Sequence, residues 1–371
     1  MGGGLAASGA VAVEWVDMDS AVPFNPNEAP PPGVSNPAFN GYRTDLPLCD
    51  AHVHLSGAHD FAWDAQMVRG LLEHFGMERV ALLGLPSSSH RDYADPGNNA
   101  RCLAVKRALN AERPDRFVYA CAGLDLRFGG ADDPDDLLAQ ARARAAEGYD
   151  GFKLLLGKPG LRKRLALPID GPVFAPFFSF LEETGLPVTM HAGDPPDFWD
   201  PARAAAGGKW AYDGTFPSLA QIRAEVEGVL RAHPRLRLTL AHLFFLGDRP
   251  DEAARLLETY PHLCFDLTPG GEMYAGMSRD PETWRSLFLR FADRFLFGSD
   301  SDDWHSSADL ATYTWNYGFL VNLPRAFLER TAPFRFHDCD LGVLRPLGLP
   351  DEVLRAVYRD NFVRRFGERP R

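Results

Sequence analysis

The feature that most constrains this chain is a regular alternation of short β-rich runs with helix-like stretches. Eight runs rich in β-branched, aromatic and aliphatic residues are bounded by turn-forming residues, and they span 46–54, 79–85, 117–124, 151–156, 187–191, 236–243, 262–267 and 294–298. Most of the intervals have a helical pattern, as in 135–147, 174–183, 219–231 and 251–260. Such alternation is typical of a parallel sheet covered by helices.

Eight β/α units over about 320 residues predict a closed (β/α)8 TIM barrel, of class α/β, rather than an open doubly wound sheet. The apolar spacing after Pro350-Asp351 predicts a C-terminal helix packed on the barrel. Residues 1–45 differ, because glycines and a proline-rich stretch over 23–37 disfavour regular structure. We therefore expect an irregular N-terminal arm over 1–45 and one barrel domain over 46–371.

The composition and net charge of the chain restrict the kinds of partner that it could bind. The 371 residues are 45% hydrophobic and 24% charged, which is ordinary for a globular protein, and the net charge of -11 argues against nucleic acid or an anionic membrane as partner. No apolar run approaches the ~18 residues of a membrane span, and the N-terminus has no secretory signal pattern. The five cysteines are scattered. We expect a cytoplasmic protein with a small-molecule substrate, in which homo-oligomers are possible.

The first predicted strand ends in Asp-Ala-His-Val-His, at 50–54. Residues two apart in a strand face the same way, so His52 and His54 share one face and can reach one ion at the barrel mouth. Taken alone, two strand histidines bonded to neighbouring groups would explain the pattern equally well.

Other predicted strands also end in side chains that bind metals or handle protons. These are Lys153 on the fourth, His191 on the fifth, His242 on the sixth and Asp300 on the eighth. Barrel enzymes carry their active sites at these strand ends. A histidine in an apolar strand is costly without a partner, so the set favours a metal site over unrelated core histidines.

Six segments in this order resemble the amidohydrolase superfamily, and within it the branch of amidohydrolase-related hydrolases and metal-dependent decarboxylases. They are DAHVHL at 50–55, EGYDGFKLL at 147–155, GLPVTMHAGD at 185–194, LTLAHLFF at 238–245, RFLFGSD at 294–300 and YRDNFVRRFG at 358–367. Together they extend over most of the chain from 46 to 367.

The resemblance implies that His52, His54, His191 and Asp300 bind metal. Asp300 would also handle a proton, and His242 would steer water or polarise the substrate. In members with two metals, the ligands include a carboxylated lysine at the position of Lys153 and the counterpart of His242. Both residues are present here, so a second ion is possible, but we favour a single ion. Three imidazoles and a carboxylate suit Zn²⁺ best, and also Mn²⁺ or Fe²⁺.

Substrate contacts are harder to predict. Lys153, and Lys158 at the start of a basic loop with Arg162, Lys163 and Arg164, could hold a carboxylate, as could Arg127 after the third strand. Glu272 and Tyr274 follow the seventh strand in a glycine-rich loop. Asp194 could orient His191, and Trp199, Trp210 and Trp304 fall in predicted loops over the mouth. Each of these residues could equally serve loop structure or surface ion pairs.

The leading hypothesis is a metal-dependent hydrolase of a small ester, lactone or amide that carries a carboxylate. The alternative is a lyase, either a nonoxidative decarboxylase or a hydratase of a small aromatic or unsaturated acid. Many such decarboxylases carry glutamate at the position of His52, which favours hydrolysis here. A non-catalytic ligand-binding barrel and a histidinol-phosphatase-like enzyme are less consistent with the complete set of histidines and Asp300.

Overall fold

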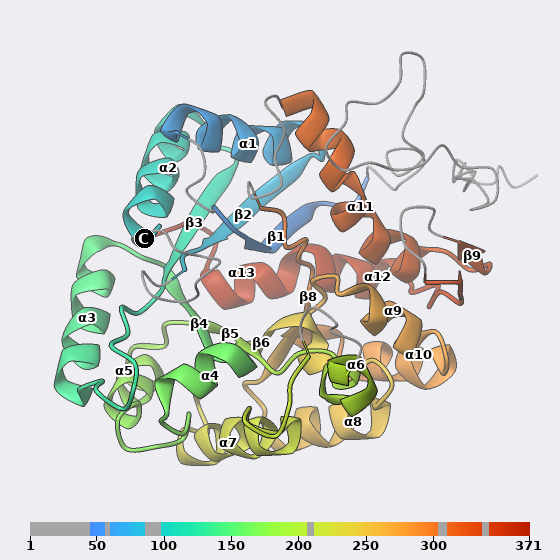
Figure 1. Ribbon diagram of the computed structural model, residues 1–371. Helices are drawn as coiled ribbons and strands as arrows, with labels where there is room; N and C mark the ends of the chain where they lie inside the picture. The colour runs from blue at the N-terminus through green and yellow to red at the C-terminus, as the bar shows by residue number, and fades with distance from the viewer. Residues whose placement is uncertain (1–44, 56–59, 86–97, 206–210, 303–309, 336–340) are drawn as a thin grey trace, which may run out of the picture.

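Eight parallel strands in sequence order form the centre of the computed structural model (Figure 1). The structure describes residues 45–55, 60–85, 98–205, 211–302, 310–335 and 341–371. The strands are β1 (Leu48–Val53), β2 (Met77–Leu83), β3 (Phe117–Ala122), β4 (Gly151–Gly157), β5 (Val188–Ala192), β6 (Leu238–Leu240), β7 (Cys264–Asp266) and β8 (Phe295–Leu296). Each pairs in parallel with the next, so the predicted barrel order is confirmed.

Backbone hydrogen bonds between β1 and the segment that begins with β8 close the ring. The amide of Ala51 donates to the carbonyl oxygen of Phe297 at 3.0 Å, and the amide of His54 donates to that of Ser301 at 2.8 Å. In the other direction, the amide of Asp300 donates to the carbonyl oxygen of His52 at 2.9 Å. Closure therefore brings the end of the first strand directly beside the residues that follow the last.

Helices surround the strands in Figure 1. They are α1 (Phe61–His74), α2 (Asn99–Glu112), α3 (Pro134–Glu147), α4 (Pro159–Leu165), α5 (Ala175–Thr184), η3 (Pro196–Trp199), α6 (Pro201–Ala205), α7 (Leu219–Ala232), η4 (Ala241–Phe245), α8 (Pro250–Thr259), α9 (Gly271–Met277), α10 (Pro281–Arg290), η5 (Ala292–Arg294), α11 (Leu310–Glu329), α12 (Asp351–Arg355), the π-helical turn η6 (Ala356–Asp360) and α13 (Asn361–Phe366). A small antiparallel pair, β9 (Phe334–Arg335) with β10 (Val343–Leu344), lies outside the barrel sheet.

Local sequence explains several helix ends. The side chains of Asp60, Asp133 and Ser218 accept hydrogen bonds from backbone amides in the first turns of α1, α3 and α7. Gly148 ends α3 with φ 96°, a conformation that glycine adopts without steric cost. The helices predicted at 135–147, 174–183, 219–231 and 251–260 correspond to α3, α5, α7 and α8, whose ends lie within one residue of the prediction.

The C-terminal helices cover one end of the barrel, and α13 crosses the middle of the view in Figure 1. Phe362 and Phe366 pack on Tyr119 of β3, with ring centroids 5.1 and 5.9 Å away. Tyr119 also donates to the carbonyl oxygen of Gly367 at 2.8 Å. These aromatic side chains join an apolar cluster with residues of β1, β2, β3, β7 and β8.

The predicted arm over 1–45 lies, except for Asp45, outside the described residues. Within the described ranges, no helix combines the length and the apolar character that crossing a membrane requires. The sixth predicted strand, 236–243, is shorter than expected. It ends at Leu240, and the chain then turns through η4.

Candidate metal centre

The carboxyl ends of the strands surround a cavity of about 280 Å³. Nine of the residues named from the sequence line it, from β1, β4, β5 and the segments that follow β1, β4, β5, β6, β7 and β8: His52, His54, Lys153, Lys158, His191, Asp194, His242, Glu272 and Asp300. The rest of the lining includes Asp302 and the apolar side chains of Leu85, Leu155 and Phe245. The predicted strand-end residues are therefore brought to one cavity, of a size that suits a small substrate.

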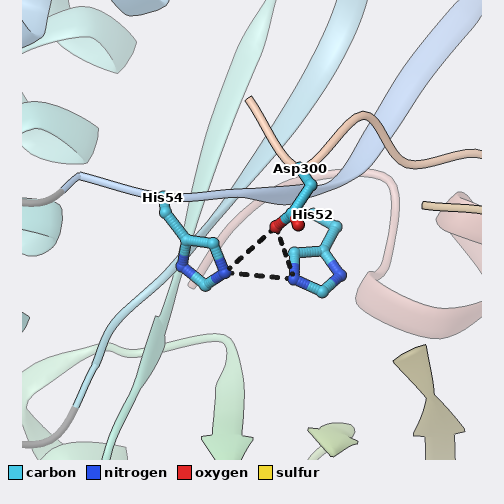
Figure 2. A group of neighbouring side chains, drawn as sticks. All are labelled: His52, His54 and Asp300. Atoms are coloured by element: carbon cyan, nitrogen blue, oxygen red, sulfur yellow. Dashed lines mark hydrogen bonds and ion pairs between the residues drawn. The ribbon is translucent and has the colours of Figure 1, made fainter. Parts of the chain in front are cut away.

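Three side chains converge at the floor of this cavity (Figure 2). His52 Nε2 lies 3.1 Å from His54 Nε2 and 3.4 Å from Asp300 Oδ1. His54 Nε2 lies 3.5 Å from the same carboxylate oxygen. Among the described residues, this group meets the spacing expected of three ligands around one cation.

The orientation of both imidazoles is set through their other nitrogen. His52 Nδ1 donates to Asp266 Oδ2 at 2.8 Å, and His54 Nδ1 donates to the carbonyl oxygen of Leu83 at 2.8 Å. Since a carboxylate and a carbonyl only accept, each ring carries its proton on Nδ1 and presents an unprotonated Nε2 to the group. Burial, followed by the nearby charge of Lys153, lowers the pKa of both histidines well below its usual range and keeps the rings neutral.

This donor set fits a divalent ion. Two imidazole nitrogens with free lone pairs and a carboxylate oxygen face one another within 3.5 Å. None of these three atoms carries a proton with which it could form a hydrogen bond to the others. Their mutual repulsion disfavours the arrangement unless a positive charge lies among them. A single ion can lie about 2 Å from all three atoms, the usual length of a zinc bond to nitrogen or oxygen. This group could therefore bind a metal ion.

Lys153 supplies a positive charge at the same place. Its Nζ donates to His52 Nε2 at 2.8 Å, and the residue is 1% exposed. Burial lowers the pKa of Lys153 to about 8, against the opposing influence of Asp300 and Asp266. The amine is therefore still mostly protonated at neutral pH, but it loses its proton far more readily than a surface lysine.

His191 lies in the cavity but outside the compact group of three. Its Nε2 donates to the carbonyl oxygen of Gly193 at 3.0 Å and to Asp194 Oδ1 at 3.1 Å, which leaves Nδ1 as the unprotonated nitrogen. Asp194 also accepts from Lys158 at 3.3 Å and from the hydroxyl of Tyr212. Burial alone would raise the pKa of Asp194, but Lys158, His191 and Tyr212 outweigh it and lower this pKa below its usual range.

His242 lies at the start of an unusual backbone turn. His242, Leu243, Phe244 and Phe245 all have φ between 52° and 54°, the left-handed region, although none is glycine. Each such residue costs about 1–2 kcal/mol, so the turn persists only because surrounding contacts hold it. The turn stacks the ring of Phe245 on that of His242, with centroids 5.3 Å apart. Burial, followed by His191, lowers the pKa of His242 to about 3, so the ring is neutral.

Two predicted substrate-binding residues are not brought to the cavity. Arg127 pairs with Asp136 at 3.0 Å on the surface, beyond the cavity lining. Tyr274 is fully buried, and its hydroxyl donates to the carbonyl oxygen of Leu267. Sequence could not separate these alternatives, because both residues follow strands, and only the path of each loop decides whether a side chain faces the mouth.

Only one of the four cations predicted in the loop after β4 lines the cavity. Lys158 does so, whereas Arg162 forms a buried two-bond ion pair with Glu225 at 2.8 Å. Lys163 lies over the ring of Phe216, and Arg164 lies over that of Phe128, each 4.0 Å from the ring centroid.

Glu272 lies at the exposed rim of the cavity, where partial enclosure, followed by the charges of Asp197 and Asp194, raises its pKa. The indole of Trp199 donates to the carbonyl oxygen of Pro217 and packs on Tyr212, with centroids 4.8 Å apart. Trp199 therefore supports the tyrosine that bonds Asp194. Trp210 and Trp304 lie outside the described residues.

Asp266, the fully buried carboxylate that orients His52, was not among the residues predicted from the sequence. Neither was Thr268, whose hydroxyl lies 3.1 Å from His52 Nδ1. A signal for Asp266 was present, because an acidic residue inside an apolar predicted strand is costly unless it is paired.

Comparisons with known proteins agree with this architecture. A family model described as Amidohydrolase matches residues 49–367. A TIM-barrel protein from Bordetella bronchiseptica is similar in structure, with a TM-score of 0.52 and 16% identity over 86% of this chain and 98% of that chain. An amidohydrolase II structure has a TM-score of 0.50 and 16% identity, over 86% and 100% of the two chains.

A 2,6-dihydroxybenzoate decarboxylase from Rhizobium has a TM-score of 0.48 and 17% identity, over 86% of this chain and 98% of the decarboxylase. Comparison with curated protein sequences finds no match. At 16% identity the two likenesses with TM-scores of 0.52 and 0.50 establish the fold alone, and the family model establishes the relationship by sequence.

Proposed function

The chain belongs to the amidohydrolase family, and we propose that it is a metal-dependent hydrolase of a small ester, lactone or amide that carries a carboxylate. The convergence of His52 Nε2, His54 Nε2 and a carboxylate oxygen of Asp300, three unprotonated atoms, is the observation that supports the proposal. The cavity above them, of about 280 Å³, admits a small substrate.

His52, His54 and Asp300 would hold one divalent ion, with His191 offering Nδ1 as a further ligand. When bound, such an ion acts as a Lewis acid and lowers the pKa of water to near neutrality. Nitrogen ligands with one carboxylate favour Zn²⁺, while Mn²⁺ and Fe²⁺ suit the same set. A single ion is the simpler assignment, because Lys153 donates a hydrogen bond to His52 and so acts here as a cation.

Asp300 is suited to move the proton. It is the one carboxylate of the group, and its side chain is 33% exposed, so an oxygen faces the cavity. Asp300 would accept the proton of the attacking water as the new bond to the substrate carbonyl carbon forms. It would then return that proton to the departing oxygen or nitrogen as the bond to the leaving group breaks.

His242 is better suited to steer the water than to donate to the substrate. Its Nδ1 lies 3.3 Å from the carbonyl oxygen of Thr268, which only accepts, so Nδ1 carries the proton and Nε2 is an acceptor. The donor to a developing oxyanion would instead be Lys153, whose ammonium lines the same cavity. Of the two roles expected from the sequence, steering water and polarising the substrate, this tautomer favours the first.

Lys158 would hold the substrate carboxylate. It lines the cavity, and its side chain is 13% exposed. Its Nζ lies 3.3 Å from Asp194 Oδ1. Leu85, Leu155 and Phe245 offer apolar contacts to the rest of a small substrate.

The first experiment is elemental analysis of purified protein, reconstituted with Zn²⁺ or Mn²⁺, alongside Asp300→Asn. One equivalent per chain that is lost in the variant supports the centre, whereas no metal in the reconstituted wild type overturns it. Lactones, esters and amides with a carboxylate are then screened for acid release, and carboxylated aromatics for CO₂. Release of CO₂ without hydrolysis would replace the hydrolase assignment with the lyase alternative.

A further inference from the structure

Asp266 is the most heavily bonded carboxylate near the candidate centre. It ends β7, is fully buried, and uses both oxygens. Oδ2 accepts from His52 Nδ1 at 2.8 Å. Oδ1 accepts from the backbone amide of His242 at 2.8 Å and from the amide and hydroxyl of Thr268 at 3.3 and 2.5 Å. One side chain therefore joins a proposed metal ligand to the backbone of another site residue.

The two partners of Asp266 both depend on it. His52 can present an unprotonated Nε2 only if an acceptor holds the proton on Nδ1. The His242 amide opens the left-handed turn over 242–245, and its bond to Oδ1 ties the turn to β7. At the other end of the turn, Arg223 donates to the carbonyl oxygen of Phe245 at 3.3 Å. Without these bonds, a strained turn of four residues other than glycine would relax.

We propose that Asp266 is a positioning residue that sets the tautomer of His52 with one oxygen and holds the turn carrying His242 and Phe245 with the other. This inference rests on the proposed function, since it assigns His52 to the ion and His242 to the water. It predicts that the metal centre and the turn are coupled through one carboxylate, although His52 and Asp266 are 214 residues apart in the chain.

Asp266→Asn separates this role from simple packing. Asparagine keeps the size and shape but has one acceptor oxygen and one donor nitrogen. If the nitrogen faces His52, the imidazole proton moves to Nε2 and blocks the lone pair that an ion needs. If the nitrogen faces His242, two donors oppose each other and the turn loses its bond. Either orientation damages one of the two tasks.

The experiment compares wild type with Asp266→Asn by Zn²⁺ titration and by ¹⁵N NMR of histidine-labelled, metal-free protein. We expect Zn²⁺ to bind 10–100-fold more weakly to the variant. The spectra should show His52 with its proton on Nε2, or else faster hydrogen exchange at the His242 amide. Zn²⁺ affinity within twofold of wild type, with both NMR signals unchanged, would overturn the proposal.

Asp50→Asn is the matched control. Asp50 is equally buried and accepts from the amides of His52 and Ser299 through Oδ1, while within the described residues its Oδ2 has no hydrogen-bond partner. An amide can replace this carboxylate without losing those bonds, so the His52 tautomer in Asp50→Asn should match wild type.

If Asp266→Asn does not fold, the wild-type spectrum decides: a proton on Nε2 of metal-free His52 overturns the inference. Because the spectra need no metal, they test Asp266 even if wild type binds none and the proposed function fails.

Discussion

The ammonium nitrogen of Lys153 lies 2.8 Å from His52 Nε2, the same lone pair that an ion would use. Lys153 comes from β4 and His52 from β1, so the contact crosses the barrel. Two cations cannot share one lone pair, and binding of an ion therefore requires the ammonium to move away from His52. Under the proposed function the residue would compete with the ion and, once displaced, would donate to the substrate.

Lys153→Met removes the amine and keeps most of the side-chain volume. We expect one equivalent of Zn²⁺ per chain to remain, bound at least as tightly as in wild type because the competing charge is gone. The rate constant kcat should fall about 10²–10³-fold through loss of an oxyanion donor. Elemental analysis and steady-state kinetics check both. A wild type with two equivalents and a variant with one would identify Lys153 as part of a two-metal site.

Asp300→Asn should leave a folded protein that binds little metal and has no activity. Asp300 has φ 58°, and asparagine tolerates this left-handed conformation, so loss of the ligand is separated from backbone strain. Circular dichroism reports the fold, and elemental analysis reports the metal. Asp302→Asn is the control, since Asp302 lines the same cavity outside the group of three and its variant should keep the ion. Full metal in Asp300→Asn would contradict the assignment.

His242→Asn tests the steering role of the sixth-strand histidine. Asparagine again accepts the left-handed backbone at this position, where φ is 54°. We expect kcat to fall about 10²–10⁴-fold with little change in KM, because a group that handles the water is removed. Metal content should not change. Loss of one of two equivalents would instead make His242 a ligand.

Gly298→Ala should destabilise the fold near the centre. A Cβ at this position would lie 2.9 Å from Thr268 Oγ1 and 3.0 Å from His52 Cβ. Crowding of this kind typically costs about 1–3 kcal/mol in the free energy of unfolding, and it would also press on the bonds of Asp266. Denaturant unfolding measures the effect. Gly214→Ala, where no atom lies within 4 Å of the added carbon, should be nearly neutral, and an equal loss in both variants would count against this explanation.

His233 should make stability depend on pH. Burial lowers the pKa of this histidine, only partly offset by Glu182, so the folded protein leaves it neutral where the unfolded chain binds a proton. Its contribution to stability is therefore present above pH ~6.5 and is lost as the pH falls below that value. His233→Gln should flatten the decline between pH 7 and 5, by at most about 1.4 kcal/mol per pH unit. Above pH 7.5 the free energies of unfolding of the two proteins should change with pH in parallel. If they also decline in parallel below pH 6.5, the prediction is refuted.

Much of the architecture follows from local patterns. The eight barrel strands and the helices α3, α5, α7 and α8 were predicted from residues two, three or four apart, and β6, β7 and β8 are shorter than predicted. Leucines at 236, 238 and 240 alternate with Arg237 and Thr239 and so indicate a strand, yet the chain leaves β6 after Leu240. The left-handed turn that follows depends on Asp266 and Arg223, contacts that no local pattern contains.

By itself, the sequence determined the alternation that requires a parallel barrel, and the strand-end positions of His52, His54, His191 and Asp300 that bring them to one mouth. Tertiary structure alone decided that Asp266 and the Leu83 carbonyl turn two Nε2 atoms toward Asp300, while Arg127 and Tyr274 face elsewhere. The physical reason is the separation along the chain of the groups that interact. Side-chain periodicity is set by neighbours within one or two turns, whereas tautomers, ion pairs and loop paths are set by groups that meet only when the barrel closes.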